Sequence, residues 1–136
     1  MSIEKRILNS SRTVAVVGLS SKPDRPSHKV ASYLKEQGYT IIPVNPTERE
    51  VLGEICYPDL ASVPTSIDVV DIFRRSEEVL PIVKEAIKIG AKTVWMQEGV
   101  INEEAADRAR EAGLMVVMDK CMRKEHLKLH GRGDEA

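Results

Sequence analysis

A loop at residues 18–27 combines residue types that bind phosphate groups. The segment GLSSKPDRPS begins with a glycine after a strand-like run and continues with two serines, one lysine, one arginine and a third serine positioned to cap a helix. Glycine allows close backbone approach, hydroxyls donate hydrogen bonds, and a helix N-terminus offers free N–H groups. An ordinary polar loop is the alternative, but the coincidence favours an anion site. Its predicted members are Gly18, Ser20, Ser21, Lys22, Arg25 and Ser27.

The segment after the next strand-like run argues against ordinary NAD binding. A dinucleotide fold usually places Asp or Glu there to hold the ribose hydroxyls. This chain has Asn45 and Pro46 instead. Pro46 restricts Asn45 to an extended conformation, which predicts a stiff wall rather than a carboxylate clamp. Glu48 is close enough in sequence to keep the NAD alternative open.

Two more polar segments follow later strand-like runs. FRRS at residues 73–76 supplies a cationic pair, and QEGV at residues 97–100 ends the run that contains Trp95. Core packing is the favoured interpretation of this tryptophan. Glu98 and Asp119 are interpreted as solvated or structurally paired carboxylates rather than as an acid/base pair.

The terminal segment MDKCMRKEHLKLH holds the only sequence proximity between a thiol and imidazoles, namely Cys121 with His126 and His130. Catalysis by a Cys–His pair needs a particular spatial arrangement, which two residues of a terminal helix do not establish. A reactive thiol would require Cys121 to face the ligand crevice with a lowered pKa. No catalytic residue is therefore predicted, and no cluster with metal-ligand spacing is present in the sequence.

The elements that position these loops alternate between short β-branched runs and helical patterns. Nearly continuous apolar runs indicate strands that are covered on both faces. The strands are expected at residues 13–17, 40–44, 67–72, 93–96 and 114–118, and the helices at 27–37, 76–89, 102–112 and 122–129. Ser27 and Ser76 are the expected N-caps, Pro81 is expected to distort the second helix, and a short irregular crossover joins strands two and three. This order predicts an α/β, Rossmann-like doubly wound, mainly parallel sheet of about five strands with helices on both faces.

Composition limits the classes of protein to which the chain can belong. The chain has 136 residues, of which 42% are hydrophobic and 30% charged, and its net charge is -1. These values predict a single domain over residues 1–136, with a polar tail from about residue 131. The absence of basic excess argues against nucleic acid, and no apolar run is long enough for a membrane span. The charged N-terminal segment predicts a cytoplasmic protein, and Cys56 and Cys121 are expected to be free thiols.

The segments VAVVGLSSKPDRPSHKVASYLKEQGY, IIPVNP, VVDIFRRSEEV, VWMQEGV and MDKCMRKEH together resemble the small stand-alone CoA-binding-domain proteins. That family is related to the amino-terminal CoA-binding domain of the succinyl-CoA synthetase alpha subunit. The resemblance covers about residues 13–126 and implies a Rossmann-like fold with coenzyme A across the strand ends. It implies CoA contacts at Gly18, Ser20, Ser21, Lys22, Arg25, Ser27, Asn45, Pro46, Phe73, Arg74, Gln97, Glu98 and Gly99.

Two functions remain open at this point. The favoured hypothesis is a module that binds CoA or an acyl-CoA without chemistry of its own, as a carrier, sensor or accessory subunit, with a possible homo-oligomer or protein partner. The alternative is an NAD(H)-binding redox sensor or small oxidoreductase. Ligase chemistry in the synthetase depends on a histidine in a later domain and on a partner subunit, so the resemblance does not imply it here.

Overall fold

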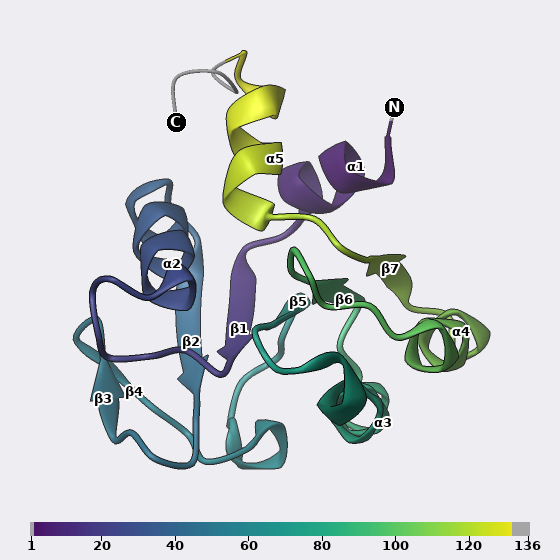
Figure 1. Ribbon diagram of the computed structural model, residues 1–136, viewed down its shortest axis with the longest axis horizontal. Helices are drawn as coiled ribbons and strands as arrows, with labels where there is room; N and C mark the ends of the chain where they lie inside the picture. Colours follow the sequence, from purple (N-terminus) through teal and green to yellow (C-terminus); the bar gives the residue numbers. More distant parts are fainter. Residues whose placement is uncertain (1, 132–136) are drawn as a thin grey trace.

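A parallel sheet forms the centre of the computed structural model, which describes residues 2–131 (Figure 1). Its strands are β1 (Thr13–Val17), β2 (Thr40–Val44), β5 (Val69–Ile72), β6 (Thr93–Met96) and β7 (Met115–Val117). They lie in the order β2-β1-β5-β6-β7, and each neighbouring pair is parallel. The predicted α/β doubly wound fold is confirmed, with strand ends within two residues of those expected.

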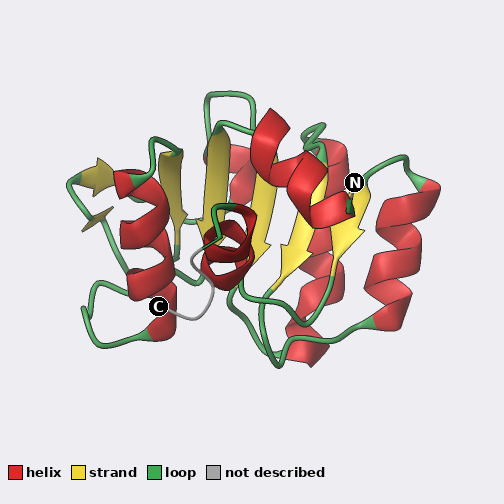
Figure 2. Ribbon diagram, turned by 90° about the horizontal axis from the view of Figure 1, so that it is seen from above, coloured by secondary structure: helices red, strands yellow, loops and turns green. Residues whose placement is uncertain are grey.

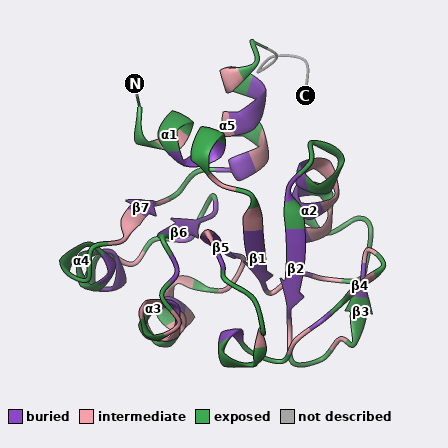
Figure 3. Cartoon of the chain, turned by 180° about the vertical axis from the view of Figure 1, so that it is seen from behind, coloured by how far each residue is buried: buried purple, intermediate pink, exposed green. Residues whose placement is uncertain are grey.

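Two groups of helices cover the two faces of the sheet (Figure 2). One face carries α1 (Ile3–Ser10), α2 (Pro26–Glu36) and α5 (Met122–Leu129), and the other carries α3 (Val79–Lys88) and α4 (Glu103–Glu111). Val14 and Val16 pack into the first core, whereas Ala15 and Val17 pack into the second. Figure 3 shows the result as buried strands between helices whose outer faces are exposed. No helix within residues 2–131 is long and apolar enough to cross a membrane.

The strand order reverses between β1 and β5, which makes this the topological switch point of the sheet. Gly18 ends β1 with a φ of +88°, and a Cβ atom there would lie 2.4 Å from the carbonyl oxygen of Phe73. Only glycine fits this position, because a side chain would meet the backbone that follows β5. The two loops therefore touch, and their side chains face one crevice.

Both expected serine caps are wrong. Arg25 is the N-cap of α2 because Pro26 occupies the first helical position, where its fixed φ and missing N–H are tolerated. The second helix begins with a 3₁₀ turn, η2 (Ser76–Glu78), capped by Arg75, and α3 follows from Val79. Pro81 then falls in the first turn of α3, where its missing N–H has no intrahelical partner to lose.

The crossover between β2 and β5 is more ordered than expected. It forms a small antiparallel hairpin, β3 (Glu50–Val51) with β4 (Glu54–Ile55), followed by the 3₁₀ helix η1 (Leu60–Ser62). Tyr57 pairs in parallel with Val44, so the free edge of β2 is partly covered. The sequence analysis also gave no element for α1, whereas it predicted α5 with its observed ends. The part of the expected polar tail beyond residue 131 lies outside the described residues.

Candidate functional site

A cavity of about 600 Å³ opens at the carboxyl ends of the strands, beside the switch point. Its apolar lining comes from α2, from the loop after β5 and from the loop after β6, and arginines line it at the start of α2 and after β5. The lining residues are Gly18, Ser20, Arg25, Pro26, Ser27, Val30, Phe73, Arg74, Arg75, Gln97, Glu98, Gly99, Val100 and Cys121. Its size is that of a small-molecule site.

Most of the predicted contact residues line this cavity, and four lie outside it. Ser21 donates its hydroxyl hydrogen to Glu48 at 3.0 Å, and Lys22 is exposed on the outer part of the loop. Asn45 donates from Nδ2 to the carbonyl oxygen of Leu19 at 3.0 Å, so it holds the first loop in place. Pro46 lines a separate groove of about 240 Å³ that shares Gly18 and Arg74 with the cavity. The contact assignments themselves stay predictions.

Serines fix the conformation of the first loop. The backbone N–H of Ser20 donates to the hydroxyl of Ser27 at 3.0 Å, and the Ser20 hydroxyl accepts from the backbone N–H of Lys22 at 3.1 Å. The start of α2 is thus tied to the end of β1. Pro26 has no N–H, and the N–H groups of His28 and Lys29 donate to the carbonyl oxygen of Arg25. The positive end of the α2 dipole lies at the cavity, where it favours an anion.

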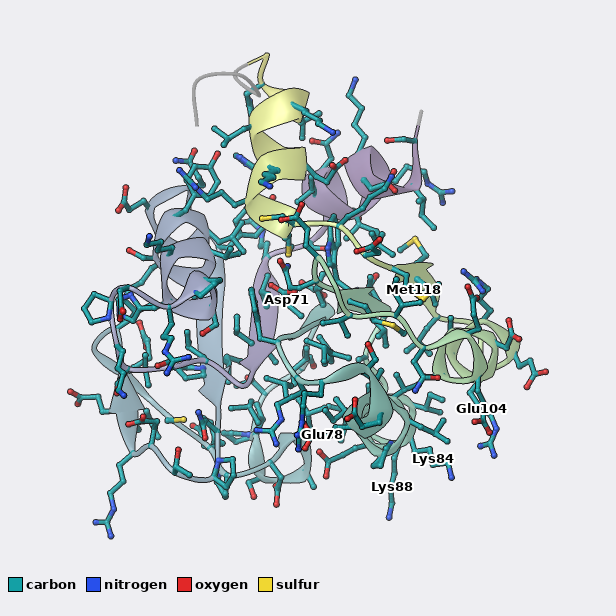
Figure 4. All side chains as sticks on the ribbon, in the orientation of Figure 1. Asp71, Glu78, Lys84, Lys88, Glu104 and Met118 are labelled. Atoms are coloured by element: carbon teal, nitrogen blue, oxygen red, sulfur yellow. The ribbon has the colours of Figure 1, made fainter. Side chains whose placement is uncertain are left out.

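Arg74 and Arg75 are both held by an acidic residue at the start of α3. Arg74 donates from Nε and Nη2 to the two carboxylate oxygens of Glu78, at 3.1 and 3.2 Å, and Arg75 also contacts Glu78 at 3.2 Å. Hydrogen bonds from these two arginines hold the pKa of Glu78 below its usual value. Figure 4 shows Glu78 at the start of α3. One carboxylate shared by two arginines leaves excess positive charge beside the cavity.

A buried carboxyl that was not predicted from the sequence lies behind Gln97, one of the residues that line the cavity. Asp71 in β5 is fully buried, in the middle of the sheet in Figure 4, and its Oδ1 accepts a hydrogen bond of 2.7 Å from Nε2 of Gln97. Burial raises the pKa of Asp71 to about 7, against the smaller lowering effect of the Gln97 bond. The available signal was an acid inside the apolar run VVDIF, where charged residues are rare.

Cys121 does face the cavity, but its environment does not activate it. Burial raises the pKa of the Cys121 thiol, so the neutral form dominates at neutral pH. The Nδ1 atom of His126 lies 2.7 Å from the hydroxyl oxygen of Tyr33. The geometric condition for a reactive thiol is met and the electrostatic condition is not.

The remaining polar groups at this wall are in structural contacts. Glu98 pairs with Lys124 at 3.0 Å, and the carboxylate of Asp119 accepts a 2.7 Å hydrogen bond from the backbone N–H of Gly99. Trp95 is fully buried and donates its indole N–H to the carbonyl oxygen of Lys120, in agreement with core packing. Among the described residues no cluster of His, Cys, Asp and Glu could hold a metal ion.

This combination of a parallel sheet, a reversed strand order and an arginine-lined crevice at the switch point defines a Rossmann-like α/β domain with a small-molecule site. The chain matches the family model described as CoA binding domain over residues 12–127. The protein therefore belongs to the CoA-binding-domain family.

Individual relatives agree with this assignment. The chain is 43% identical over 122 residues to the uncharacterized protein YneT of Bacillus subtilis, covering 90% of each protein. A solved structure of a hypothetical protein from Pyrococcus horikoshii OT3 has a TM-score of 0.91 and 44% identity, over 94% of this chain and 90% of that one. The chain is also 26% identical over 121 residues to the ADP-forming acetate–CoA ligase I of Archaeoglobus fulgidus. That match spans 82% of this chain and only 18% of the ligase.

Proposed function

We propose that this protein binds coenzyme A or an acyl-CoA across the carboxyl ends of its strands, as a carrier, sensor or accessory module without chemistry of its own. The main observation behind this proposal is that one cavity is lined by Arg25, Arg74 and Arg75, by apolar side chains and by the start of α2. A ligand with both phosphates and a long, weakly polar arm uses both kinds of wall. Membership of the CoA-binding-domain family supports the same ligand.

The shape of the site supports a particular placement of the ligand. The larger cavity and the groove of about 240 Å³ meet at Gly18 and Arg74. We place the phosphates at this junction, where the arginines and the N-terminus of α2 converge. The pantetheine arm then extends along Val30 and Val100 in the larger cavity, and the adenine end occupies the groove beside Pro46.

The condition of the reactive groups supports binding rather than catalysis. The Cys121 thiol has a raised pKa, and Glu98 and Asp119 are engaged with Lys124 and with the backbone of Gly99. Asp71 is fully buried. None of these groups is in the arrangement of a nucleophile with an adjacent base.

One observation favours NAD(H) as a second candidate ligand. The carboxylate of Glu48 accepts a hydrogen bond from Ser21, so an acidic group does lie beside the first loop. A carboxylate in that region can hold ribose hydroxyls. The two ligands are distinguished by phosphate charge, since CoA carries a 3′-phosphate in addition to the pyrophosphate that NAD also has.

Calorimetric titration tests the proposal. We expect CoA to bind about tenfold more tightly than 3′-dephospho-CoA and about a hundredfold more tightly than NAD, because each charge-assisted phosphate contact contributes roughly 1.5 to 3 kcal/mol. CoA should also lose the most affinity when salt is added. Native mass spectrometry beforehand identifies any ligand that co-purifies. If NAD bound as tightly as CoA, NAD(H) would replace CoA as the proposed ligand. Equal affinities for CoA and dephospho-CoA would refute the role of phosphate charge.

Arg25→Ala is expected to weaken CoA binding about tenfold and to reduce its dependence on salt. The side chain of Arg25 makes no capping hydrogen bond, so its removal should leave α2 intact. Lys128→Ala is the matched control, since this exposed cation pairs with Glu125 at 3.3 Å on α5 and does not line the cavity. The affinities of both variants and of the wild type for CoA, measured at two salt concentrations, test this prediction. A larger loss with Lys128→Ala than with Arg25→Ala would show that the phosphates bind elsewhere.

A further inference from the structure

The buried carboxyl of Asp71 has no assigned role in binding, yet it connects directly to the cavity. It is fully buried, and among the described residues its Oδ2 atom has no hydrogen-bond partner. Its strand neighbours in register are Val16 of β1 and Trp95 of β6, neither of which titrates. An unsatisfied buried oxygen is costly, so its retention beside a ligand cavity calls for a functional reason.

Gln97 links this carboxyl to the cavity. Its Nε2 donates to Oδ1 of Asp71 at 2.7 Å, and the same side chain lines the cavity wall. A primary amide that turns its NH₂ group inward leaves its carbonyl oxygen on the other side. In this arrangement the wall offers a hydrogen-bond acceptor to a ligand.

The protonation state of Asp71 restricts which way the amide can turn. An ionised carboxylate only accepts hydrogen bonds, so it requires the NH₂ group of Gln97. A protonated carboxyl can donate to the carbonyl oxygen of Gln97, and a half turn of the amide then places NH₂ toward the cavity. Burial raises the pKa of Asp71 to about 7, so both forms are populated near neutral pH.

We propose that Asp71 and Gln97 form a proton-controlled selector, in which the wall presents an acceptor when Asp71 is ionised and a donor when it is protonated. This inference rests on the proposed CoA site. The thiol that ends CoA is a weak donor, whereas the thioester of an acyl-CoA offers a carbonyl acceptor in its place. Free CoA is therefore favoured by ionised Asp71 and acyl-CoA by protonated Asp71. Asp71 is a positioning residue that acts through Gln97.

The groups that face Asp71 from the surrounding elements do not replace it as the titrating group. The Cys121 thiol, at the N-cap of α5, interacts electrostatically with Asp71, and burial keeps this thiol neutral by raising its pKa. At the rim, Glu98 is paired with Lys124. The elements packed over this face supply apolar side chains, including Ile7 of α1 and Val30 of α2. The other charged or titratable groups that line the cavity or lie on α5 are Arg25, Arg74, Arg75, Arg123, Glu125, His126 and Lys128, with His130 at the C-cap of α5. Tyr33 and Tyr39 pack in the same core.

The test compares CoA with acetyl-CoA by calorimetry at about pH 6 and about pH 8. In the wild-type protein we expect the affinity ratio of acetyl-CoA to CoA to fall about fivefold between these values, the effect of one hydrogen bond. Repeating the titrations near pH 7 in two buffers with different ionisation enthalpies should reveal proton uptake that is greater for acetyl-CoA than for CoA. Neither readout requires a variant to fold.

Asp71→Asn should make the affinity ratio independent of pH, because asparagine offers both a donor and an acceptor at every pH. The contributions of the ligand phosphates, the ligand thiol and all other titrating groups remain in this variant, so its difference from the wild type isolates the contribution of Asp71. Thr93→Val is the matched control: Thr93 is fully buried with an unpartnered hydroxyl, but lies at the amino end of β6, and this variant should keep the wild-type pH response. A pH-independent ratio in the wild-type protein, or the same response in Asp71→Asn, would overturn the selector while leaving the CoA site standing. Failure of both ligands to bind would instead refute the proposed function and the selector with it.

Discussion

Gly18→Ala is expected to lower the free energy of unfolding by about 3 kcal/mol and to weaken CoA binding at least about tenfold. Two costs combine at this position. The backbone has a φ of +88°, which is unfavourable for a residue with a side chain, and the new Cβ would lie 2.4 Å from the carbonyl oxygen of Phe73. Relief of that contact requires the loops after β1 and β5 to separate, and these loops carry the serines and arginines of the proposed phosphate site. Urea denaturation and a CoA titration measure the two effects.

Gly113→Ala is the control for the backbone cost alone. Gly113 has a nearly identical φ of +90°, but no atom lies within 4 Å of an added Cβ. This variant should lose only about 1 to 2 kcal/mol and keep its CoA affinity. Equal losses of stability in the two variants would mean that contact between the loops at the switch point contributes nothing.

Asp71→Asn is expected to change how stability depends on pH by about 4 kcal/mol between pH 4 and pH 7. Burial raises the pKa of Asp71 from 3.8 to about 7 in the folded protein, so the unfolded chain releases this proton at lower pH than the folded chain does. In that window the unfolded state binds fewer protons, and stability from Asp71 falls as pH rises. It is fully present below about pH 4 and lost by about pH 7. The variant lacks this loss and should gain stability relative to the wild type across the window.

Urea denaturation at several pH values measures the free energy of unfolding of Asp71→Asn and of the wild type. The contributions of all other titrating groups cancel when one value is subtracted from the other. Asp107→Asn serves as the control, because Asp107 is exposed and pairs with Arg110 at 3.4 Å on the surface of α4. Its stability should differ from the wild type by less than about 1 kcal/mol at every pH. A constant difference between Asp71→Asn and the wild type would show that Asp71 ionises in the folded protein as readily as in the unfolded one.

The strands and the loops at their ends were predictable because both depend on local sequence. Nearly continuous apolar runs such as Thr13–Val17 are typical of strands covered on both faces, and parallel order brings their carboxyl ends together. The caps of α2 and α3 were predicted wrongly because two signals competed. Ser27 has the preferred type for an N-cap, but Pro26 fixes the helix start one residue earlier and frees Ser27 to bind the backbone of Ser20.

The far wall of the cavity could not be predicted because it depends on contacts between distant segments. Asp71 and Gln97 are 26 positions apart and meet only when β5 and β6 pair. Cys121 enters the site because the chain returns from β7 over the ends of the neighbouring strands before α5 begins. α1 was missed for a similar reason: its segment is polar apart from a few residues, and Ile7 and Leu8 become a buried stripe only against other elements.

The packing of α1 against α5 and β7 has a consequence for how the protein is made. Glu4 and Lys120 form an ion pair of 2.9 Å across 116 positions of sequence. During synthesis α1 leaves the ribosome before β7 and α5, the elements that cover its apolar stripe. Cys121 directly precedes α5, so the step that docks this helix also completes the cavity wall. The cavity is therefore incomplete in the nascent chain until the segment with Cys121 and α5 has been synthesised and has docked.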